Sequence, residues 1–274
     1  MPLTAFQQTL LADLARERSD GGYLAGGAAL HFAPNSARFS DDLGFFHDSL
    51  ERVATAYQSD AERLKSAGYA VALEVSQPGF IRAIVSRNDN ATRVDWAHDS
   101  AWRFMPLVRD PVGGLLLHPV DLAVSKTLAL AGRDESRDFV DILFIHVRVL
   151  PIAALSWAAV GKDPGFTPLS LLELLKRRGR NRPEDFARLN LAEPFDLQSA
   201  KTRWLTALDD AEQFARAAPP DDAGCLYWSV SECEFVLPAI DDIATKRVIP
   251  HFGRLGGVLP QLPNPVDRDH LTDP

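Results

Sequence analysis

Two aspartates stand within apolar runs in the first half of the sequence. Asp42 opens the run Asp42-Leu43-Gly44-Phe45-Phe46, and Asp95 lies in the run Arg93-Val94-Asp95-Trp96. A carboxylate rarely opens a buried strand without a reason, and Mg²⁺ in proteins is held by one or two carboxylates together with the phosphate oxygens of a substrate. Asp42 therefore predicts a magnesium site, whereas Asp95 on its own would be an acid that is satisfied within an apolar strand.

The dipeptide Gly26-Gly27 precedes Asp42 and lies between an expected strand and an expected helix. Glycines let a phosphate approach the backbone, and the N–H groups and dipole of a helix N-terminus favour an anion. The alternative is a tight turn that requires a positive φ. The dipeptide is compatible with both interpretations, so the phosphate-binding one depends on the carboxylate that follows.

Lys126 is surrounded in the sequence by apolar residues, which include Leu122 and Leu128. A lysine in such a helix either extends its amine to solvent or directs it at a ligand. Farther along, Arg137 and Asp141 have the i,i+4 spacing of an ordinary surface ion pair, worth about 0.2–0.5 kcal/mol. Both interpretations of Lys126 stay open on its sequence surroundings alone.

The segment Lys176-Arg177-Arg178-Gly179-Arg180-Asn181-Arg182 is the one concentrated basic stretch in a chain of net charge −8. It follows a leucine-rich helical pattern, so its cations would either contact a nucleic-acid backbone or complement the dipole of the helix C-terminus. The acidic pI near 5.4 restricts any nucleic-acid contact to such a local patch.

The pattern of apolar residues and breakers predicts an α/β (α+β) protein whose first half holds the strands. The expected elements are a helix over 3–17, a strand over 23–25, a short helix over 28–32, a strand over 42–46, a helix over 50–67 and an antiparallel meander of strands over 69–75, 80–87 and 92–96. Asp48 or Ser49 is the expected N-cap of the long helix.

Helical patterns dominate the second half, with helices expected over 119–131 and 137–150 and further helices to about residue 218. A linker is expected at Pro219-Pro220-Asp221-Asp222. The Pro-rich end from Pro250 to Pro274 is typical of a tail or an extended arm. We therefore expect an α/β domain over 1–118, a helical domain over 119–218, and a linker, short helices and tail over 219–274.

Composition fits a globular protein that is large enough to be an enzyme, with 274 residues, 46% hydrophobic and 24% charged. Cys225 and Cys233 lack the spacing of a zinc site or disulfide framework, which favours a reducing compartment, the cytoplasm. The start Met1-Pro2-Leu3-Thr4 predicts no signal peptide. The apolar run over 149–160 is shorter than the roughly 20 residues of a membrane span, so no membrane partner is expected.

Taken in order, these segments resemble the AbiEii/AbiGii toxin family, which belongs to the DNA polymerase β type nucleotidyltransferase superfamily. The motifs that carry the resemblance are Leu24-Ala25-Gly26-Gly27-Ala28-Ala29-Leu30, Arg38 through Phe46, Asp95, Leu122-Ala123-Val124-Ser125-Lys126, Arg133 and Arg137-Asp138-Phe139-Val140-Asp141, with an extension through Lys162-Asp163-Pro164-Gly165-Phe166. Each motif is short, and together they are fairly specific.

The resemblance implies a nucleotidyltransferase-like mixed sheet with flanking helices, followed by a mostly helical C-terminal domain. It also implies a metal-dependent enzyme that moves a nucleoside monophosphate from an NTP to an RNA acceptor, a transfer RNA in characterised relatives. Such an enzyme is the toxin of a toxin–antitoxin pair, so the implied partners are an NTP, transfer RNA through Lys176–Arg182, and a cognate antitoxin.

The same resemblance implies a set of site residues. The catalytic residues would be Asp42, Asp95 and Lys126, and the metal ligands for Mg²⁺ or Mn²⁺ would be Asp42 and Asp95. The nucleotide-binding residues would be Gly26, Gly27, Arg38, Ser40, Lys126 and Arg133. Two metals about 4 Å apart would complete such a site, and Lys126 would meet the charge that develops on phosphate.

The sequence departs from the family pattern at Gly44, where relatives carry the second aspartate of Asp-x-Asp. Residues 42 and 44 of a strand share a face while Asp41 points to the opposite one. Either the activity is reduced, or Asp48, Asp41 or a substrate group replaces the missing ligand. Alternatively, the chain is a non-catalytic relative that binds a nucleotide or a partner, or a helical interaction protein whose resemblance is only ancestral.

Overall fold

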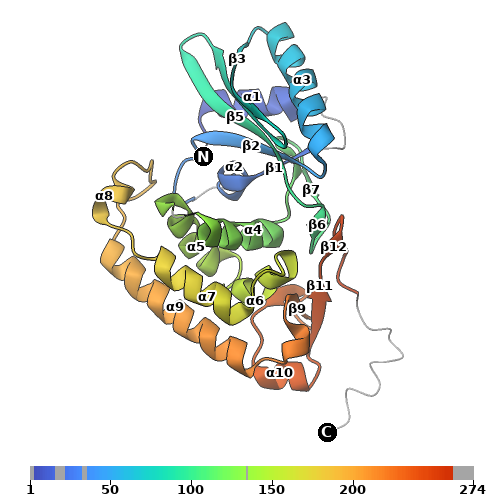
Figure 1. Ribbon diagram of the computed structural model, residues 1–274, viewed down its shortest axis with the longest axis vertical. Helices are drawn as coiled ribbons and strands as arrows, with labels where there is room; N and C mark the ends of the chain where they lie inside the picture. The colour runs from blue at the N-terminus through green and yellow to red at the C-terminus, as the bar shows by residue number, and fades with distance from the viewer. Residues whose placement is uncertain (1–2, 16–21, 33–35, 134, 262–274) are drawn as a thin grey trace. The chain divides into compact units, whose positions relative to one another are not determined.

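The computed structural model describes residues 3–15, 22–32, 36–133 and 135–261 (Figure 1). The chain folds into two compact units. Unit one comprises the described residues of Met1–Leu122 together with Pro183–Phe195, and unit two comprises those of Ala123–Arg182 and Asp196–Pro274.

A seven-stranded mixed sheet forms the centre of unit one, in the order β3-β4-β5-β2-β1-β8-β7. Its strands are β1 (Gly22–Ala25), β2 (Asp42–His47), β3 (Ala70–Gln77), β4 (Phe80–Arg87), β5 (Asn90–His98), β7 (Val108–Asp110) and β8 (Gly114–Leu116), and the short β6 (Trp102–Arg103) follows β5 in the chain. β2 runs parallel to β5 and β1 runs parallel to β8, whereas the other neighbours are antiparallel. The expected α/β class and mixed sheet are confirmed.

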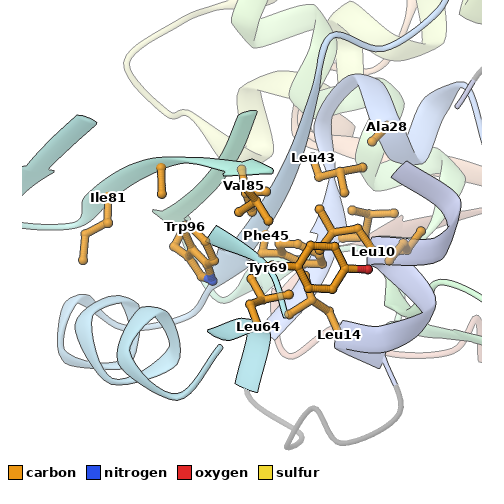
Figure 2. Close-up of a cluster of buried hydrophobic side chains, with 14 of the residues drawn as sticks. Leu10, Leu14, Ala28, Leu43, Phe45, Leu64, Tyr69, Ile81, Val85 and Trp96 are labelled. Carbon is orange, nitrogen blue, oxygen red and sulfur yellow. The ribbon is translucent and has the colours of Figure 1, made fainter. Parts of the chain in front are cut away.

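Helices α1 (Ala5–Ala15) and α3 (Leu50–Ser66) contact the sheet, and α2 (Gly26–Leu30) follows β1 directly. Ser49 begins α3, because its side chain accepts a hydrogen bond from the backbone N–H of Arg52. Alternate strand residues are buried, so one face of the sheet joins the helices in a single apolar core. Figure 2 shows this core, which includes Leu10, Leu14, Leu43, Phe45, Leu64, Val85 and Trp96.

The alternation that buries one face leaves the other face only half-buried along β2, β4 and β5. We call this the open face. On β2 it carries Asp42, Gly44 and Phe46, while Leu43 and Phe45 enter the core. A residue of β2 that faces a ligand from this side of the sheet must therefore lie an even number of positions from Asp42.

The connection between β4 and β5 fixes which residues of the two strands lie opposite each other. Asn88 and Asp89 form a two-residue turn, Asn88 adopts a φ of 55°, and Arg87 pairs with Asn90. Counting outward from this turn places Arg82 opposite Asp95. A short turn of this kind sets the register of the whole hairpin.

The segment Pro183–Phe195, which holds α8 (Pro183–Phe186), packs within unit one although it is distant in sequence. Two backbone hydrogen bonds hold it to the segment before β2 and form an isolated antiparallel bridge between Arg38 and Leu191: Phe39 N donates to Asn190 O at 2.8 Å, and Ala192 N donates to Ala37 O at 3.0 Å. The chain just before Asp42 is thus fixed by a non-local partner.

Unit two is mostly helical. It contains the larger part of α4 (Pro119–Gly132), then α5 (Ser136–Arg148), α6 (Ile152–Lys162), α7 (Pro168–Arg178), α9 (Leu197–Ala217), the short helices η1 (Pro220–Asp222) and α10 (Ile240–Ala244), and the strands β9 (Cys225–Ser229), β10 (Glu234–Val236), β11 (Val248–Phe252) and β12 (Arg254–Leu255). β9, β10 and β11 form an antiparallel sheet in the order β10-β9-β11, which the sequence pattern did not predict.

Among the described helices, none is by itself both long and apolar enough to cross a membrane. The helices α5 and α6 reach that length and composition only as a pair, with a bend of 113° between them.

Candidate functional site

The glycine dipeptide forms the turn between β1 and α2. Gly26 has a φ of +70°, which favours glycine. Gly27 is needed for space, because a Cβ on it would lie 2.9 Å from Arg38 Nη2 and 3.1 Å from Ser40 Oγ. The expected helix does follow, but α2 has only five residues and contributes little macrodipole. Any affinity of this turn for an anion must come from the side chains beside it.

Arg38 and Ser40 supply those side chains. Arg38 is 4% exposed and its Nη1 donates to Phe39 O at 3.1 Å. Ser40 Oγ donates to Asp42 O at 2.9 Å and lies 3.5 Å from Asp42 Oδ1. The structure therefore brings together four residues that the resemblance places in the nucleotide site: Gly27, Arg38, Ser40 and Asp42.

A glutamine from α1 fixes the start of two strands. Gln7 Nε2 donates to Ser40 O at 3.0 Å and to Thr92 Oγ1 at 3.1 Å, and Gln7 is buried. These contacts tie the entrances of β2 and β5 together next to Asp42 and Arg93. Sequence reasoning missed Gln7, because nothing in an amphipathic helix marks one buried amide.

Asp95 lies on the open face and forms an ion pair with Arg82 of β4. Arg82 Nε donates to Asp95 Oδ1 and Arg82 Nη2 donates to Asp95 Oδ2, both at 2.7 Å. The hydrogen bond to Asp95 raises the pKa of Arg82, and the charges of Asp95 and Asp42 act in the same direction. The resemblance gave no role to Arg82, yet the two-residue turn at Asn88 and Asp89 was the signal that places it opposite Asp95.

Gly44 lies in the same row of the sheet, between Ala25 of β1 and Asp95 of β5. A Cβ on Gly44 would lie 3.1 Å from Phe46 Cε2. The phenyl ring of Phe46 is therefore in tight contact with the space that a side chain at position 44 would use. That ring also stacks with Tyr23 at a centroid distance of 6.2 Å. Aromatic surface thus borders the position of the missing aspartate.

The neighbouring aspartates do not replace the missing carboxylate. Asp48 accepts two hydrogen bonds from Arg103 Nη2, at 2.6 and 2.5 Å, and the Arg103 side chain is 3% exposed. Asp41 is exposed and stands before β2, with the opposite parity to Asp42. Asp41 therefore does not share the face of Asp42 and Asp95, and Asp48 is already bound through both carboxylate oxygens by Arg103.

Arg93 is the second arginine on the open face, directly opposite Asp42 in the parallel pair. Its Nε is buried and has no hydrogen-bond partner within the described parts of the chain. Arg93 shares the parity of Asp95, so strand alternation could have identified it from the sequence.

The carboxylates of the open face do not fit a two-metal site. Gly44 offers no ligand, Asp95 is bound to Arg82 through both oxygens, and Arg93 places a second cation beside Asp42. In the described ranges no group of three or more histidine, cysteine, aspartate or glutamate side chains could hold a metal ion. Two arginines therefore balance the two aspartates where a metal pair requires net negative charge.

Lys126 and Arg133 belong to unit two, where they form a charged cluster with α5. Lys126 Nζ lies 2.6 Å from Asp141 Oδ2 and 3.2 Å from Asp138 Oδ1, and Arg133 Nε lies 2.6 Å from Asp138 Oδ2. Both carboxylates are fully buried. Burial tends to raise the pKa of Asp138, but hydrogen bonds from Arg133 and the charge of Lys126 outweigh it and lower that pKa. Lys126 is thus held by two carboxylates within unit two.

The basic stretch Lys176–Arg182, which begins in the last turn of α7, contains both paired and exposed cations. Lys176 Nζ contacts Glu212 at 2.7 Å and Glu173 at 3.5 Å, and the hydrogen bond with Glu212 raises the pKa of Lys176. Arg178 Nε donates to Ala131 O at 3.1 Å. Arg177, Arg180 and Arg182 are exposed. Lys176 and Arg178 therefore hold α7 to neighbouring helices. The exposed arginines of the stretch are the ones available to a phosphate backbone.

A hollow beside β11 in unit two is lined by Trp228, Ile249, His251, Phe252 and residues that follow them. None of the predicted site residues lines it. The groups that could carry chemistry are instead the side chains of the open face and of the Lys126 cluster.

Comparisons with known proteins bear on the fold. The sequence matches no protein-family model and no curated protein. The structure is similar to MenT4, a nucleotidyltransferase toxin from Mycobacterium tuberculosis H37Rv, with a TM-score of 0.50 and 18% identity over 77% of this chain and 85% of that chain. It is also similar to JHP933 from Helicobacter pylori, with a TM-score of 0.45 and 15% identity over 76% of this chain and 90% of that chain. The likeness to MenT4 shows that the chain has the nucleotidyltransferase fold, as the resemblance predicted.

Proposed function

We propose that this chain binds a nucleoside triphosphate at the Gly26-Gly27 turn and the open face of unit one, and that its reaction is transfer of the nucleoside monophosphate to RNA. The cluster of Gly27, Arg38, Ser40 and Asp42 carries the proposal. A turn without side-chain bulk lies beside a guanidinium, a hydroxyl and a carboxylate on one side of a nucleotidyltransferase sheet.

In the proposed reaction the acceptor hydroxyl attacks the α-phosphorus of the triphosphate. A new oxygen–phosphorus bond forms, the bond to the pyrophosphate breaks, and the hydroxyl proton passes to a carboxylate, for which Asp42 is the candidate. Cations stabilise the charge that develops on the phosphate oxygens. Arg38 and Arg93 are the candidates on the open face, and the resemblance assigns the same role to Lys126 and Arg133.

The proposed acceptor is transfer RNA, bound through the basic stretch Lys176–Arg182. Its exposed arginines, Arg177, Arg180 and Arg182, support this proposal, because a chain of net charge −8 needs a local patch to attract a nucleic acid. A toxin role in the cytoplasm with a cognate antitoxin is proposed by analogy to MenT4, which is described as a toxin.

The second candidate function is binding of the nucleotide without transfer. Gly44 and the Arg82–Asp95 ion pair favour it, because the first removes one carboxylate from the open face and the second engages both oxygens of another. In that case the chain is a silent relative whose nucleotide site remains.

The test is incubation of the purified protein with each labelled NTP and total transfer RNA, in Mg²⁺ and in Mn²⁺, beside Asp42→Ala and Gly44→Asp. Label on RNA that disappears in Asp42→Ala establishes the transferase. Label from Gly44→Asp but not from the natural chain establishes the silent relative. Absence of both NTP binding and label in every protein would contradict both functions.

A further inference from the structure

The open face presents four charged side chains in two adjacent rows of the sheet. In one row Arg93 of β5 lies opposite Asp42 of β2. In the next row Gly44 of β2, Asp95 of β5 and Arg82 of β4 follow one another across three strands. Side chains in register on neighbouring strands share a face, so each aspartate has an arginine as its lateral neighbour.

In the first row the guanidinium group of Arg93 contains a hydrogen-bond donor without an acceptor in the part of the chain that the structure describes. Arg93 Nε is buried and has no hydrogen-bond acceptor among the described residues. Buried polar groups are nearly always hydrogen-bonded, because an unpaired one loses its contacts with water and gains none. A phosphate oxygen beside Asp42 would provide the missing acceptor.

The second row neutralises the carboxylate that a metal would need. Arg82 uses Nε and Nη2 on Asp95, which leaves Nη1 to meet an anion, and the Arg82 side chain remains 29% exposed. A guanidinium presents its donors in a planar fork that suits both a carboxylate and a phosphate. Arg82 can therefore bridge Asp95 and a bound phosphate group.

We propose that Arg82 and Arg93 take the place of divalent cations on the open face, so that the triphosphate binds here without Mg²⁺. This inference rests on the proposed nucleotide binding and assigns the counter-charge of that site to the chain itself. Three aspartates would repel a triphosphate unless metal ions intervened, whereas two aspartates balanced by two arginines do not.

The experiment measures binding of ATP and of inorganic tripolyphosphate by calorimetry, once in excess EDTA and once in Mg²⁺. The natural chain is compared with Arg93→Gln, Arg82→Gln and the control Arg52→Gln, which removes an equal charge from an exposed position of α3. For the natural chain we expect similar dissociation constants with and without Mg²⁺. In Arg93→Gln and Arg82→Gln the affinity for ATP should fall by about tenfold or more, as for loss of a charge-assisted hydrogen bond. Arg52→Gln should leave the affinity unchanged.

Binding that requires Mg²⁺ would overturn this inference and leave the proposed function standing. Absence of ATP binding under both conditions would instead overturn the proposed function. If an arginine variant fails to fold, the comparison of EDTA with Mg²⁺ in the natural chain still decides. Mn²⁺ titration of the natural chain adds a second readout, because tight binding of two ions without nucleotide would also contradict the arginine assignment.

Discussion

Arg82 holds both carboxylate oxygens of Asp95 at 2.7 Å, in the row of the sheet where Gly44 carries no side chain. The two features act together, since one removes a negative charge from the open face and the other neutralises a second. Asp42 keeps its place beside the glycine turn and its contact with Ser40. The fold is that of a nucleotidyltransferase, but the charge of its open face is not that of a two-metal site.

Restoring the negative charge of the open face should create metal affinity. We predict that Arg82→Gln binds Mn²⁺ more tightly than the natural chain, and that Arg82→Gln combined with Gly44→Asp binds it more tightly still, because a second carboxylate then joins Asp95. Paramagnetic resonance of free Mn²⁺ measures this. The ring of Phe46 must shift by a few tenths of an ångström to admit the new side chain.

The control for that prediction is Arg52→Gln, which lowers the net charge equally at an exposed position of α3. If Arg82→Gln gains no more Mn²⁺ affinity than this control, the ion pair with Asp95 does not limit metal binding.

Adding one methyl group at Gly27 should weaken nucleotide binding. The new Cβ would stand 2.9 Å from Arg38 Nη2, so Gly27→Ala must displace a guanidinium that is almost fully buried. We expect an ATP affinity lower by about tenfold and a stability loss of about 1–3 kcal/mol from overpacking. Calorimetry and urea unfolding measure the two effects.

Gly132→Ala is the matched control for the methyl group. Its φ is not left-handed, and no atom of the described residues beyond its own helix and chain neighbours lies within 4 Å of its Cβ position. It should leave ATP binding unchanged. Equal ATP affinity in Gly27→Ala and Gly132→Ala would show that the glycine turn is not part of the nucleotide site.

Removing the charge of Lys126 should strongly destabilise unit two. Lys126→Met removes the ammonium group that contacts the buried carboxylates of Asp138 and Asp141, and breaking buried ion pairs of this kind costs about 3–5 kcal/mol. The pKa of Asp138 is lower in the folded state than in the unfolded state, where it is about 3.9. The stabilising contribution of Asp138 is therefore present above the unfolded-state pKa and is lost as the pH falls through the folded-state pKa.

The destabilisation by Lys126→Met should therefore be largest near about pH 7 and shrink below about pH 4, where the variant's carboxylates take up protons. Urea unfolding at both pH values measures it, with Lys65→Met at an exposed position as the control. A cost at neutral pH no greater than that of Lys65→Met would mean that the buried ion pairs contribute nothing to stability.

The exposed arginines at the end of α7 and in the loop that follows should control RNA affinity and its salt dependence. The double change Arg177→Gln and Arg180→Gln is predicted to weaken transfer RNA binding and to lower the salt slope by about two, one for each phosphate contact. Filter binding over a range of salt concentrations measures the slope. The control changes Arg216 and Arg247 to glutamine, two exposed arginines that are paired with Glu212 and Asp242. If this control loses as much RNA affinity as the double change in the basic stretch, the effect is due to net charge.

The elements that position Asp42 could be predicted from the sequence because their signals are local. The breakers at Gly68, Pro78 and Asn88 separate the strands of the meander, and strand alternation places Asp42 and Gly44 on one face. The structure confirms these elements to within a few residues. Local patterns sufficed here because each strand of the meander pairs with its neighbour in the chain.

The contacts that change the chemistry of the site depend on pairing between distant segments. The pairing of Leu191 with Arg38 joins two segments that are distant in sequence, and a bridge this short leaves no periodic signal. Arg82 is the exception, because the turn at Asn88 and Asp89 already determines that it faces Asp95.

Nucleotide binding on the open face can be tested residue by residue with amide NMR of the glycines during an ATP titration in the absence of divalent cations. Gly26, Gly27 and Gly44 report on the turn and the open face, while Gly132 and Gly161 of unit two are reference positions. We predict saturable shifts of the first three amides at one common dissociation constant. Saturable ATP binding that leaves all three unshifted, or no binding at all, would contradict nucleotide binding at this face.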